Sequence, residues 1–434
     1  MTDKVVFPPS IWAATAPARV PAPPLQESLE ADVAIIGGGF SGLSTALHLA
    51  RRGRRAIVLE GAEVGWGASG RNNGQVIPTL SAVEPDAIVQ RFGEAGERLV
   101  HLIRDSAAIT FDLIREENIS CEAEQSGWFQ PAHSPGRIKL SQKRVEAWRR
   151  HGAPAEFLDR DETRELIGSE AWYGGMLNPT GGHINPLALA RGLASACEAK
   201  GVTIYENSPV SAYEREGDMW VLTTPQGVVR ASSVVLATQA YTDVLSRTLA
   251  PRIARTIIPI LSWQVATEPL GDNLRARIVP GRQAVSDTRA DLRFLRYDAR
   301  NRLITGGALI SSSNAESKLQ ALVGARMAET FPELGVPRLT HIWSGNIAIT
   351  PDRWPKFHML GPNMWSWIGC NGRGVALAIA TGREIAAAID GVSLDELALP
   401  LTDPKPIGFH AIGRKVAPFV LAWYRRKDQV EPLL

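Results

Sequence analysis

Three glycines and one acidic residue near the N-terminus have a spacing that carries a definite chemistry. Gly37, Gly39 and Gly42 fit the pattern G-x-G-x-x-G. The pattern predicts a tight turn at the first glycine, close approach of a pyrophosphate at the second, and close packing of a helix on a strand at the third. Glu60 follows at the ~20-residue offset where a carboxylate accepts hydrogen bonds from ribose hydroxyls. We therefore expect these residues to bind a dinucleotide.

The surrounding residues predict the elements that position this site. Residues 33–36 form an apolar run that predicts a buried strand, and apolar positions in 43–50 recur at the helix period. A second apolar run, 56–59, leads directly to the acidic residue. The helix N-terminus would offer free N–H groups and a positive dipole end to phosphates. We expect Phe40 and Ser41, in the turn, to lie beside the phosphates.

Three later segments have a related character. Residues 61–75 are too rich in glycine for a strand or helix, and their hydroxyl, guanidinium and amide groups suit a long polyanionic ligand. Residues 365–375 predict a strand and a glycine loop, and the apolar residues 376–389 predict a helix after it. That helix would direct a second positive dipole end at a ligand. Residues 233–238 predict a buried strand whose small final residues leave room for a ligand.

The composition excludes several other classes of protein. The 434 residues are 44% hydrophobic and 21% charged, as in ordinary globular domains, and the formal net charge of +2 argues against a nucleic-acid-binding protein. The three cysteines form no disulfide framework, which suits a reducing compartment. No histidines have H-x-x-x-H or H-E-x-x-H spacing, so we expect no catalytic metal. Without a secretory signal or a long apolar run, we expect a cytoplasmic protein.

The dinucleotide site is divided among distant parts of the chain. Residues 33–75, 202–238 and 368–389 carry its patterns, while 82–179 and 253–339 predict a second, more antiparallel domain. A nicotinamide dehydrogenase usually keeps its nucleotide domain continuous, whereas this interrupted arrangement is typical of flavoproteins. The expected fold class is α/β with α+β. A discontinuous Rossmann-like domain binds the dinucleotide, and a domain with a mixed or antiparallel sheet binds the substrate.

These motifs resemble those of the D-amino-acid-oxidase-like FAD-dependent amine oxidoreductases, and within that family most of all the gamma-glutamylputrescine oxidoreductase branch. The matching stretches are Asp32–Gly42, Ile57–Gln75, Gly181–Pro186, Arg302–Gly307, Trp343–Asn346 and Gly369–Gly374. The resemblance implies FAD as the cofactor. The predicted parts are an N-terminal arm (1–29), FAD-binding segments (30–84, 183–245 and 341–392), substrate-domain segments (85–182 and 246–340) and a C-terminal tail (393–434).

The resemblance also implies which residues contact FAD. They are Gly37, Gly39, Phe40, Ser41 and Gly42 at the pyrophosphate, Glu60 at the ribose, Ser69, Gly70, Arg71, Asn72, Asn73, Gly74 and Gln75 at the flavin, Val210, Ala237 and Thr238 near the adenine, and Gly369, Gly372, Arg373, Gly374 and Val375 at the isoalloxazine. Relatives that attach flavin covalently use a cysteine near the segment that here reads Ser344-Gly345. Since that segment has no cysteine, we expect non-covalent FAD.

The chain departs from the branch at two places, and from some other relatives at a third. Asn73-Gly74 stands where the branch usually has Gly-Gly, and Gly372-Arg373-Gly374 stands where it usually has Gly-His-Gly. We expect the permanent charge of Arg373 to favour the anionic reduced flavin and to raise its reduction potential. The lysine that some relatives use for oxygen chemistry is absent from 302–306. The electron acceptor is therefore dioxygen or another acceptor, such as a membrane quinone.

The implied reaction is hydride transfer from the carbon beside an amine nitrogen to flavin N5, after which the imine is hydrolysed. The expected substrate is a secondary amine, an N-substituted or cyclic amino acid, or a gamma-glutamyl polyamine. Arg296 is the candidate for binding a substrate carboxylate, because arginine binds carboxylates bidentately. His183 and Trp343 are candidates for the substrate pocket, each with a purely structural alternative.

Two other readings of the whole chain stay open. One is an NAD-linked dehydrogenase, and the other is a flavoprotein that is non-catalytic or acts on a macromolecule. The tail has a separate choice, because residues 415–427 interleave apolar and basic side chains. Such a segment predicts either a packed C-terminal helix or a peripheral contact with an anionic inner-membrane surface.

Overall fold

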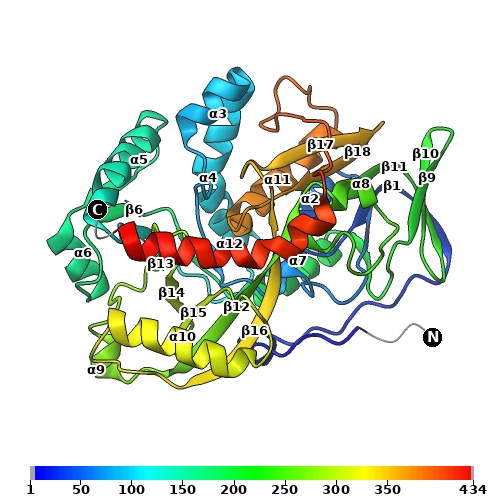
Figure 1. The fold of residues 1–434 in the computed structure, drawn as a ribbon. Helices are drawn as coiled ribbons and strands as arrows, with labels where there is room; N and C mark the ends of the chain where they lie inside the picture. Colours follow the sequence, from blue (N-terminus) through cyan, green and yellow to red (C-terminus); the bar gives the residue numbers. More distant parts are fainter. Residues whose placement is uncertain (1–4, 432–434) are drawn as a thin grey trace.

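Two eight-stranded sheets organise residues 5–431, the part of the chain that the computed structural model describes (Figure 1). The first sheet has the order β17-β18-β11-β1-β2-β8, and β10 and β9 extend from β11. Its strands are β1 (Ser28–Ile36), β2 (Ala56–Leu59), β8 (Thr203–Tyr205), β9 (Ala212–Glu216), β10 (Met219–Thr223), β11 (Val228–Leu236), β17 (Lys356–Gly361) and β18 (Met364–Ile368). Parallel pairing joins β8, β2, β1, β11 and β18. Three distant segments thus form one Rossmann-like sheet, which confirms the predicted discontinuous domain.

Strand β1 is buried on both faces because its side chains alternate between two cores. Val33 and Ile35 pack into a core with helices α2 (Phe40–Ala50), α4 (Glu94–Glu116), α7 (Pro186–Ala199) and α11 (Gly374–Ile389). Ala34 and Ile36 pack on the other face with apolar residues of β10 and β11. A continuous apolar run is what a parallel strand covered on both faces requires.

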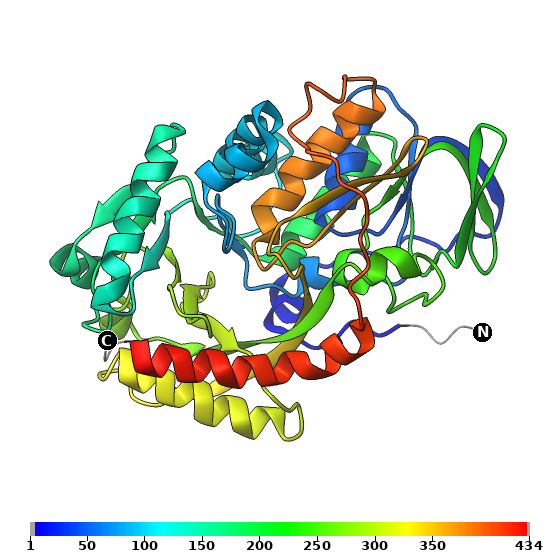
Figure 2. The same ribbon diagram turned by 45° about the horizontal axis from the view of Figure 1, so that its top comes forward.

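The second sheet has the order β16-β12-β15-β14-β13-β4-β6-β5. Its strands are β4 (Trp128–Pro131), β5 (Glu156–Leu158), β6 (Gly175–Asn178), β12 (Ile258–Pro269), β13 (Ala284–Ser286), β14 (Phe294–Tyr297), β15 (Arg302–Gly307) and β16 (Leu339–Ile349). All pairs are antiparallel except β13 with β4, so the expected mixed sheet is confirmed. Helix α10 (Ala315–Thr330) packs on one face of it through Leu319 and Val323. Helix α12 (His410–Val430) contacts β12 of this sheet and runs in nearly the same direction as α10 in both views (Figures 1 and 2).

The remaining elements lie outside these two sheets. They are α1 (Ile11–Thr15), α3 (Pro85–Phe92), α5 (Ile138–Arg150), α6 (Arg160–Ile167), α8 (Pro251–Ala254), α9 (Asp272–Arg275), the 3-10 turns η1 (Ala68–Gly70), η2 (Pro135–Arg137) and η3 (Gln239–Tyr241), and a small sheet of β3 (Gln75–Val76) and β7 (Gly182–His183). Within residues 5–431, none of the helices combines the length and the apolar character needed to span a bilayer.

Three of the predicted domain boundaries fall inside strands. The boundary after residue 29 cuts β1, the boundary after residue 182 cuts β7, and the boundary after residue 340 cuts β16. The whole of β16 pairs with β12 in the second sheet, although its residues from 341 onward were assigned to an FAD-binding segment. A strand belongs to the sheet in which its pairing partner lies, and a local sequence pattern does not identify that partner.

Candidate functional site

A cavity of about 1430 Å³ lies between the two sheets. This volume exceeds the ~300–1,000 Å³ of ordinary small-molecule sites, so it has room for a dinucleotide and a second ligand. On one side its wall consists of the carboxyl ends of β1 and β2 and the beginnings of α2 and α11. On the other side it consists of β12, β14 and part of α12.

The first glycine motif forms a sharp turn between β1 and α2 at the cavity wall. Gly37 has a φ of +113°, which favours glycine, and a Cβ at Gly42 would lie 2.0 Å from the Gly37 carbonyl oxygen. Helix α2 begins after Gly39, which makes no side-chain cap, while the Phe40 N–H donates to Ser69 Oγ at 3.0 Å. The uncapped helix N-terminus faces the cavity and fits a pyrophosphate.

Glu60 is buried at the end of β2 and lies in the cavity wall. Its carboxylate accepts the Gly38 N–H at 2.7 Å and the Ala62 N–H at 2.9 Å. Burial raises the pKa of this carboxyl group, while the backbone donors act in the opposite direction. Each oxygen retains lone-pair capacity, so the side chain fits the ribose hydroxyls expected there.

A second uncapped helix begins at the same cavity. Arg373 is the N-cap residue of α11 and makes no side-chain cap, and it lines the cavity together with Gly372, Gly374 and Val375. Two positive dipole ends from sequence-distant helices thus face one cavity, which suits a ligand with two separated electron-rich groups. A pyrophosphate and the pyrimidine edge of a flavin are such groups.

Five buried polar atoms of residues in the cavity wall have no partner among the residues that the structure describes. They are Arg71 Nη2, Gln75 Oε1, Ser81 Oγ, Gln264 Oε1 and Trp367 Nε1. Buried polar atoms are rarely left unpaired, so these atoms fit a site for a polar ligand. The guanidinium of Arg71 lies 4.4 Å from the Trp66 ring and 5.3 Å from the Tyr241 ring, and burial lowers its pKa. The donors, acceptors and dipoles together fit FAD.

The predicted FAD residues fall into two groups in the structure. Those in the cavity wall are Gly37, Gly39, Phe40, Ser41, Glu60, Ser69, Arg71, Asn72, Asn73, Gln75, Val210, Ala237, Thr238, Gly372, Arg373, Gly374 and Val375. The others, Gly42, Gly70, Gly74 and Gly369, lie behind it, where a Cβ would approach a neighbouring atom to between 2.0 and 2.4 Å. We infer that these four shape the cavity through close packing.

The structure contradicts the proposed catalytic role of Arg296. Its guanidinium donates to the carbonyl oxygens of Asn73 at 2.7 Å, Tyr297 at 2.8 Å and Ile184 at 2.8 Å, and it lies 4.5 Å from the Trp12 ring. The side chain is 1% exposed and lies outside the cavity wall. Arg296 therefore fixes the backbone behind the site, and a substrate carboxylate has no access to it.

His183 and Trp343 are also outside the cavity wall. His183 is buried, its Nε2 lies 3.0 Å from the Arg282 carbonyl oxygen, and burial lowers its pKa well below the usual value. Trp343 donates its Nε1–H to the Arg71 carbonyl oxygen at 2.8 Å and packs edge-on against Trp12. Both residues were candidates for the substrate pocket, and the structure favours the structural alternative for each.

The substrate side of the cavity consists of residues that carry no sequence motif. Sequence analysis did not single out Gln264 on β12, Phe294 on β14, or the turn residues Asp287 and Arg289. Asp287 is 1% exposed and forms an ion pair with Arg289. Helix α12 adds several further residues, among them Tyr424. The local signal that could have identified this pair is an aspartate and an arginine two positions apart after a short strand.

Arg373 gives a prediction about the reduction potential of bound flavin. Its guanidinium donates to Thr79 Oγ1 at 3.0 Å and lies 4.6 Å from the Trp128 ring, and burial lowers its pKa to about 9. At pH 7 the side chain is therefore cationic and favours added negative charge on the flavin. We expect Arg373→Leu to lower the two-electron potential by about 30 mV, equivalent to about 1.4 kcal/mol, in a dye-equilibration titration.

The same titration has a pH signature. The difference between the wild type and Arg373→Leu is expected to narrow as the pH rises through about 9, because the wild-type side chain then loses its charge. Arg383→Leu, near the other end of α11 and outside the cavity wall, serves as the control. An unchanged potential in Arg373→Leu would remove the proposed influence on the flavin.

Comparisons with known proteins agree with this geometry. Residues 32–388 match the model of the DAO family, described as FAD dependent oxidoreductase. The chain is 33% identical over 384 residues to gamma-glutamylputrescine oxidoreductase of Escherichia coli (strain K12), covering 88% of this chain and 89% of that protein. It is 35% identical over 376 residues to the probable oxidoreductase OrdL of Haemophilus influenzae, covering 85% of each.

Solved structures with low sequence identity share the fold. Glycine oxidase from Geobacillus kaustophilus has a TM-score of 0.71 at 22% identity and covers 87% of this chain and 100% of its own. L-proline dehydrogenase from P. horikoshii has a TM-score of 0.70 at 20% identity, covering 85% of this chain and 96% of its own. The chain therefore belongs to the DAO family and is an FAD-dependent oxidoreductase of amines or amino acids.

Proposed function

We propose that this protein oxidises the C–N bond of an amine that also carries a carboxylate, such as an N-substituted or cyclic amino acid or a gamma-glutamyl polyamine. The observation that carries this proposal is the buried Asp287–Arg289 pair in the cavity wall opposite the expected FAD site. The Asp287 carboxylate accepts the N–H groups of Arg289 and Arg293 at 3.1 Å each and pairs with the Arg289 guanidinium, so the pair offers Arg289 to a substrate carboxylate. The relationship to a gamma-glutamylputrescine oxidoreductase supports the same substrate class.

The chemistry divides between the cofactor and the chain. When bound, FAD accepts a hydride from the carbon beside the amine nitrogen, and the resulting imine is hydrolysed to a carbonyl compound and an amine or ammonia. The chain holds the substrate in place with the Arg289 guanidinium on its carboxylate, and the buried Asp287 carboxylate orients that guanidinium through their ion pair. Phe294 is buried at the cavity wall and helps to exclude water. These assignments replace the one made for Arg296.

Matched pairs of amines test the substrate class. Purified yellow protein is mixed anaerobically with sarcosine or dimethylamine, proline or pyrrolidine, and gamma-glutamylputrescine or putrescine, and the flavin absorbance near ~450 nm is followed. We expect bleaching by the carboxylate-bearing member of at least one pair and not by its partner. Equal bleaching by both members would contradict the role of the carboxylate.

The same experiment separates the remaining readings. If dithionite bleaches the flavin but no amine does, the non-catalytic or macromolecule-directed reading gains support over the enzymatic one. Air is then admitted to the protein reduced by its substrate. If the flavin absorbance returns within the mixing time, dioxygen is the acceptor. If the flavin stays reduced, the acceptor is another compound, such as a quinone.

We also propose that α12 contacts an anionic membrane surface. Ile412, Phe419, Trp423 and Val430 recur at helical spacing on the side of α12 that does not line the cavity, and each is between 43% and 67% exposed. The basic residues that flank this apolar line are Lys415, Arg426 and Lys427. An exposed apolar line flanked by cations is what a helix lying in an anionic lipid interface requires.

Sedimentation with vesicles tests the α12 proposal. We expect the protein to sediment with phosphatidylglycerol vesicles at low salt, less with phosphatidylcholine vesicles, and to lose this binding in Phe419→Ser/Trp423→Ser. Ile310→Ser, at an exposed apolar residue outside α12, serves as the control. If the wild type sediments with neither kind of vesicle, the proposal is contradicted. If light scattering shows a dimer that the Phe419 and Trp423 substitutions dissociate, the exposed face of α12 binds a second copy of the chain instead.

A further inference from the structure

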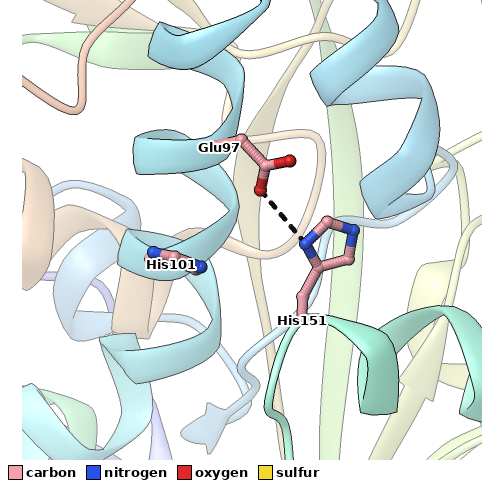
Figure 3. Close-up of side chains that lie close together, drawn as sticks. All are labelled: Glu97, His101 and His151. Atoms are coloured by element: carbon pink, nitrogen blue, oxygen red, sulfur yellow. Dashed lines mark ion pairs between the residues drawn. The ribbon is translucent and has the colours of Figure 1, made fainter.

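Two imidazoles and a carboxylate meet on the α3–α4–α5 side of the molecule, in a place that the FAD site does not use. Glu97 and His101 are one helical turn apart on α4, so their side chains lie on the same face of the helix. His151 is the C-cap residue of α5. One ligand atom from each of the three lies within 4.8 Å of the others (Figure 3). We propose that these residues form a binding site for a single zinc ion.

The distances suit tetrahedral zinc. Bonds of ~2.0–2.1 Å to nitrogen and oxygen place the ligand atoms of a tetrahedral ion about 3.3 Å apart. The His151 Nδ1 atom already lies 3.3 Å from Glu97 Oε2, as the dashed line in Figure 3 marks. His101 is exposed, so rotation of its side chain can close the remaining distance. Two histidines and one carboxylate are ordinary zinc ligands, and water completes the set.

A second carboxylate orients His151 for this role. The His151 Nε2 atom lies 3.3 Å from Asp86 Oδ1 on α3, so donation of the Nε2–H to Asp86 leaves Nδ1 free to bind a metal. Carboxylate–histidine–zinc arrangements of this kind are typical of zinc sites. Asp86 also pairs with Arg150. Arg104 donates to the His151 carbonyl oxygen at 2.9 Å and holds the backbone there.

The nearby arginines do not exclude a cation. Arg150 is paired with Asp86, and Arg104 is paired with Asp105 through two bonds of 2.7 Å each. Their charges are thus compensated, and the carboxylate of Glu97 stays available to attract the ion. The ion would link α4, which packs in one core with α11, to the end of α5. Because Leu140 and Arg144 of α5 line the cavity, the site would stabilise the substrate-side wall from a distance.

The test uses tag-free holoprotein that has been dialysed against a chelator. Zinc chloride is titrated by calorimetry, and Co²⁺ is titrated by absorption spectroscopy, in which tetrahedral coordination gives strong visible bands. We expect one equivalent to bind. His101→Gln and His151→Gln are expected to weaken binding at least about tenfold, and Asp86→Asn about tenfold through the loss of orientation. His341→Gln, at a histidine outside the cluster, is expected to bind as the wild type does.

The outcomes separate this site from the flavin site. Flavin absorbance and thermal unfolding without metal are recorded for each variant, so a folding defect is recognised independently of zinc affinity. If His151→Gln folds poorly, Glu97→Gln takes its place. Absence of stoichiometric binding, or binding that survives both the His101 and the His151 substitutions, would overturn the proposal whatever the flavin does.

Discussion

Gly42→Ala is expected to yield a protein that does not retain FAD. A Cβ at this position would lie 2.0 Å from the Gly37 carbonyl oxygen and 3.1 Å from Ile35 Cγ2. The oxygen belongs to the backbone of the turn that faces the cavity, so it can move only if the turn and the start of α2 move with it. Overpacking costs up to about 3 kcal/mol. If that cost falls on the FAD-binding conformation, the affinity drops about 100-fold.

The ratio of flavin to protein absorbance after desalting measures this effect, and calorimetric titration of the apoprotein with FAD gives the affinity. Gly271→Ala is the matched control, because its Cβ would meet open space and its φ of −66° suits alanine. Circular dichroism checks that both variants are folded. A folded Gly42→Ala protein with wild-type flavin content would show that close packing at this glycine is not required.

The expected FAD site could be predicted because its residues lie in local motifs. One strand, one helix and the next strand are enough to position the turn at Gly37 and the carboxylate of Glu60. All three elements lie within 40 consecutive residues. The loop before α11 is also a glycine loop between a strand and a helix, near the end of the chain. Parallel strands ending at one sheet edge then bring the two loops together.

The substrate side could not be predicted in the same way, because it depends on tertiary contacts. Asp287 and Arg289 lie in an irregular turn and reach the cavity only through the pairing of β13 with β4 and β14. Helix α12 reaches the cavity from the C-terminal segment, and its sequence shows only amphipathic character. No local pattern states which face of such a helix meets another part of the chain.

Arg296 shows how a local reading gives the wrong role. The sequence predicted that its guanidinium binds a substrate carboxylate, because arginine binds carboxylates bidentately. The structure instead places it against Trp12 of the N-terminal segment and three backbone carbonyl groups. Two of these carbonyl groups belong to distant residues, Asn73 and Ile184, and the third belongs to the neighbouring Tyr297. An internal cation thereby joins the N-terminal segment, the loop before β3 and the loop before α7 behind the cavity.

Arg296→Met is therefore expected to destabilise the protein without changing its substrate selectivity. The substitution keeps an unbranched stem but removes hydrogen bonds to three carbonyl oxygens. Bonds from a charged group contribute about 1.5–3 kcal/mol each, and buried acceptors left unpaired add a cost. Burial lowers the pKa of Arg296 to about 10, so the cation persists at pH 7. We expect a loss of at least about 3 kcal/mol, or about 5 °C or more in Tm.

Arg300→Met separates this effect from a general loss of charge. Arg300 lies in the connection that follows β14, and its residue is exposed, so its replacement should leave Tm nearly unchanged. The KM of the most effective amine from the bleaching experiment is measured for both variants. If Arg296→Met kept the wild-type Tm and raised KM more than tenfold, the guanidinium would have to contact substrate. Its three backbone acceptors predict a lower Tm and an unchanged KM, because a side chain that holds loops together stabilises the fold without contacting substrate.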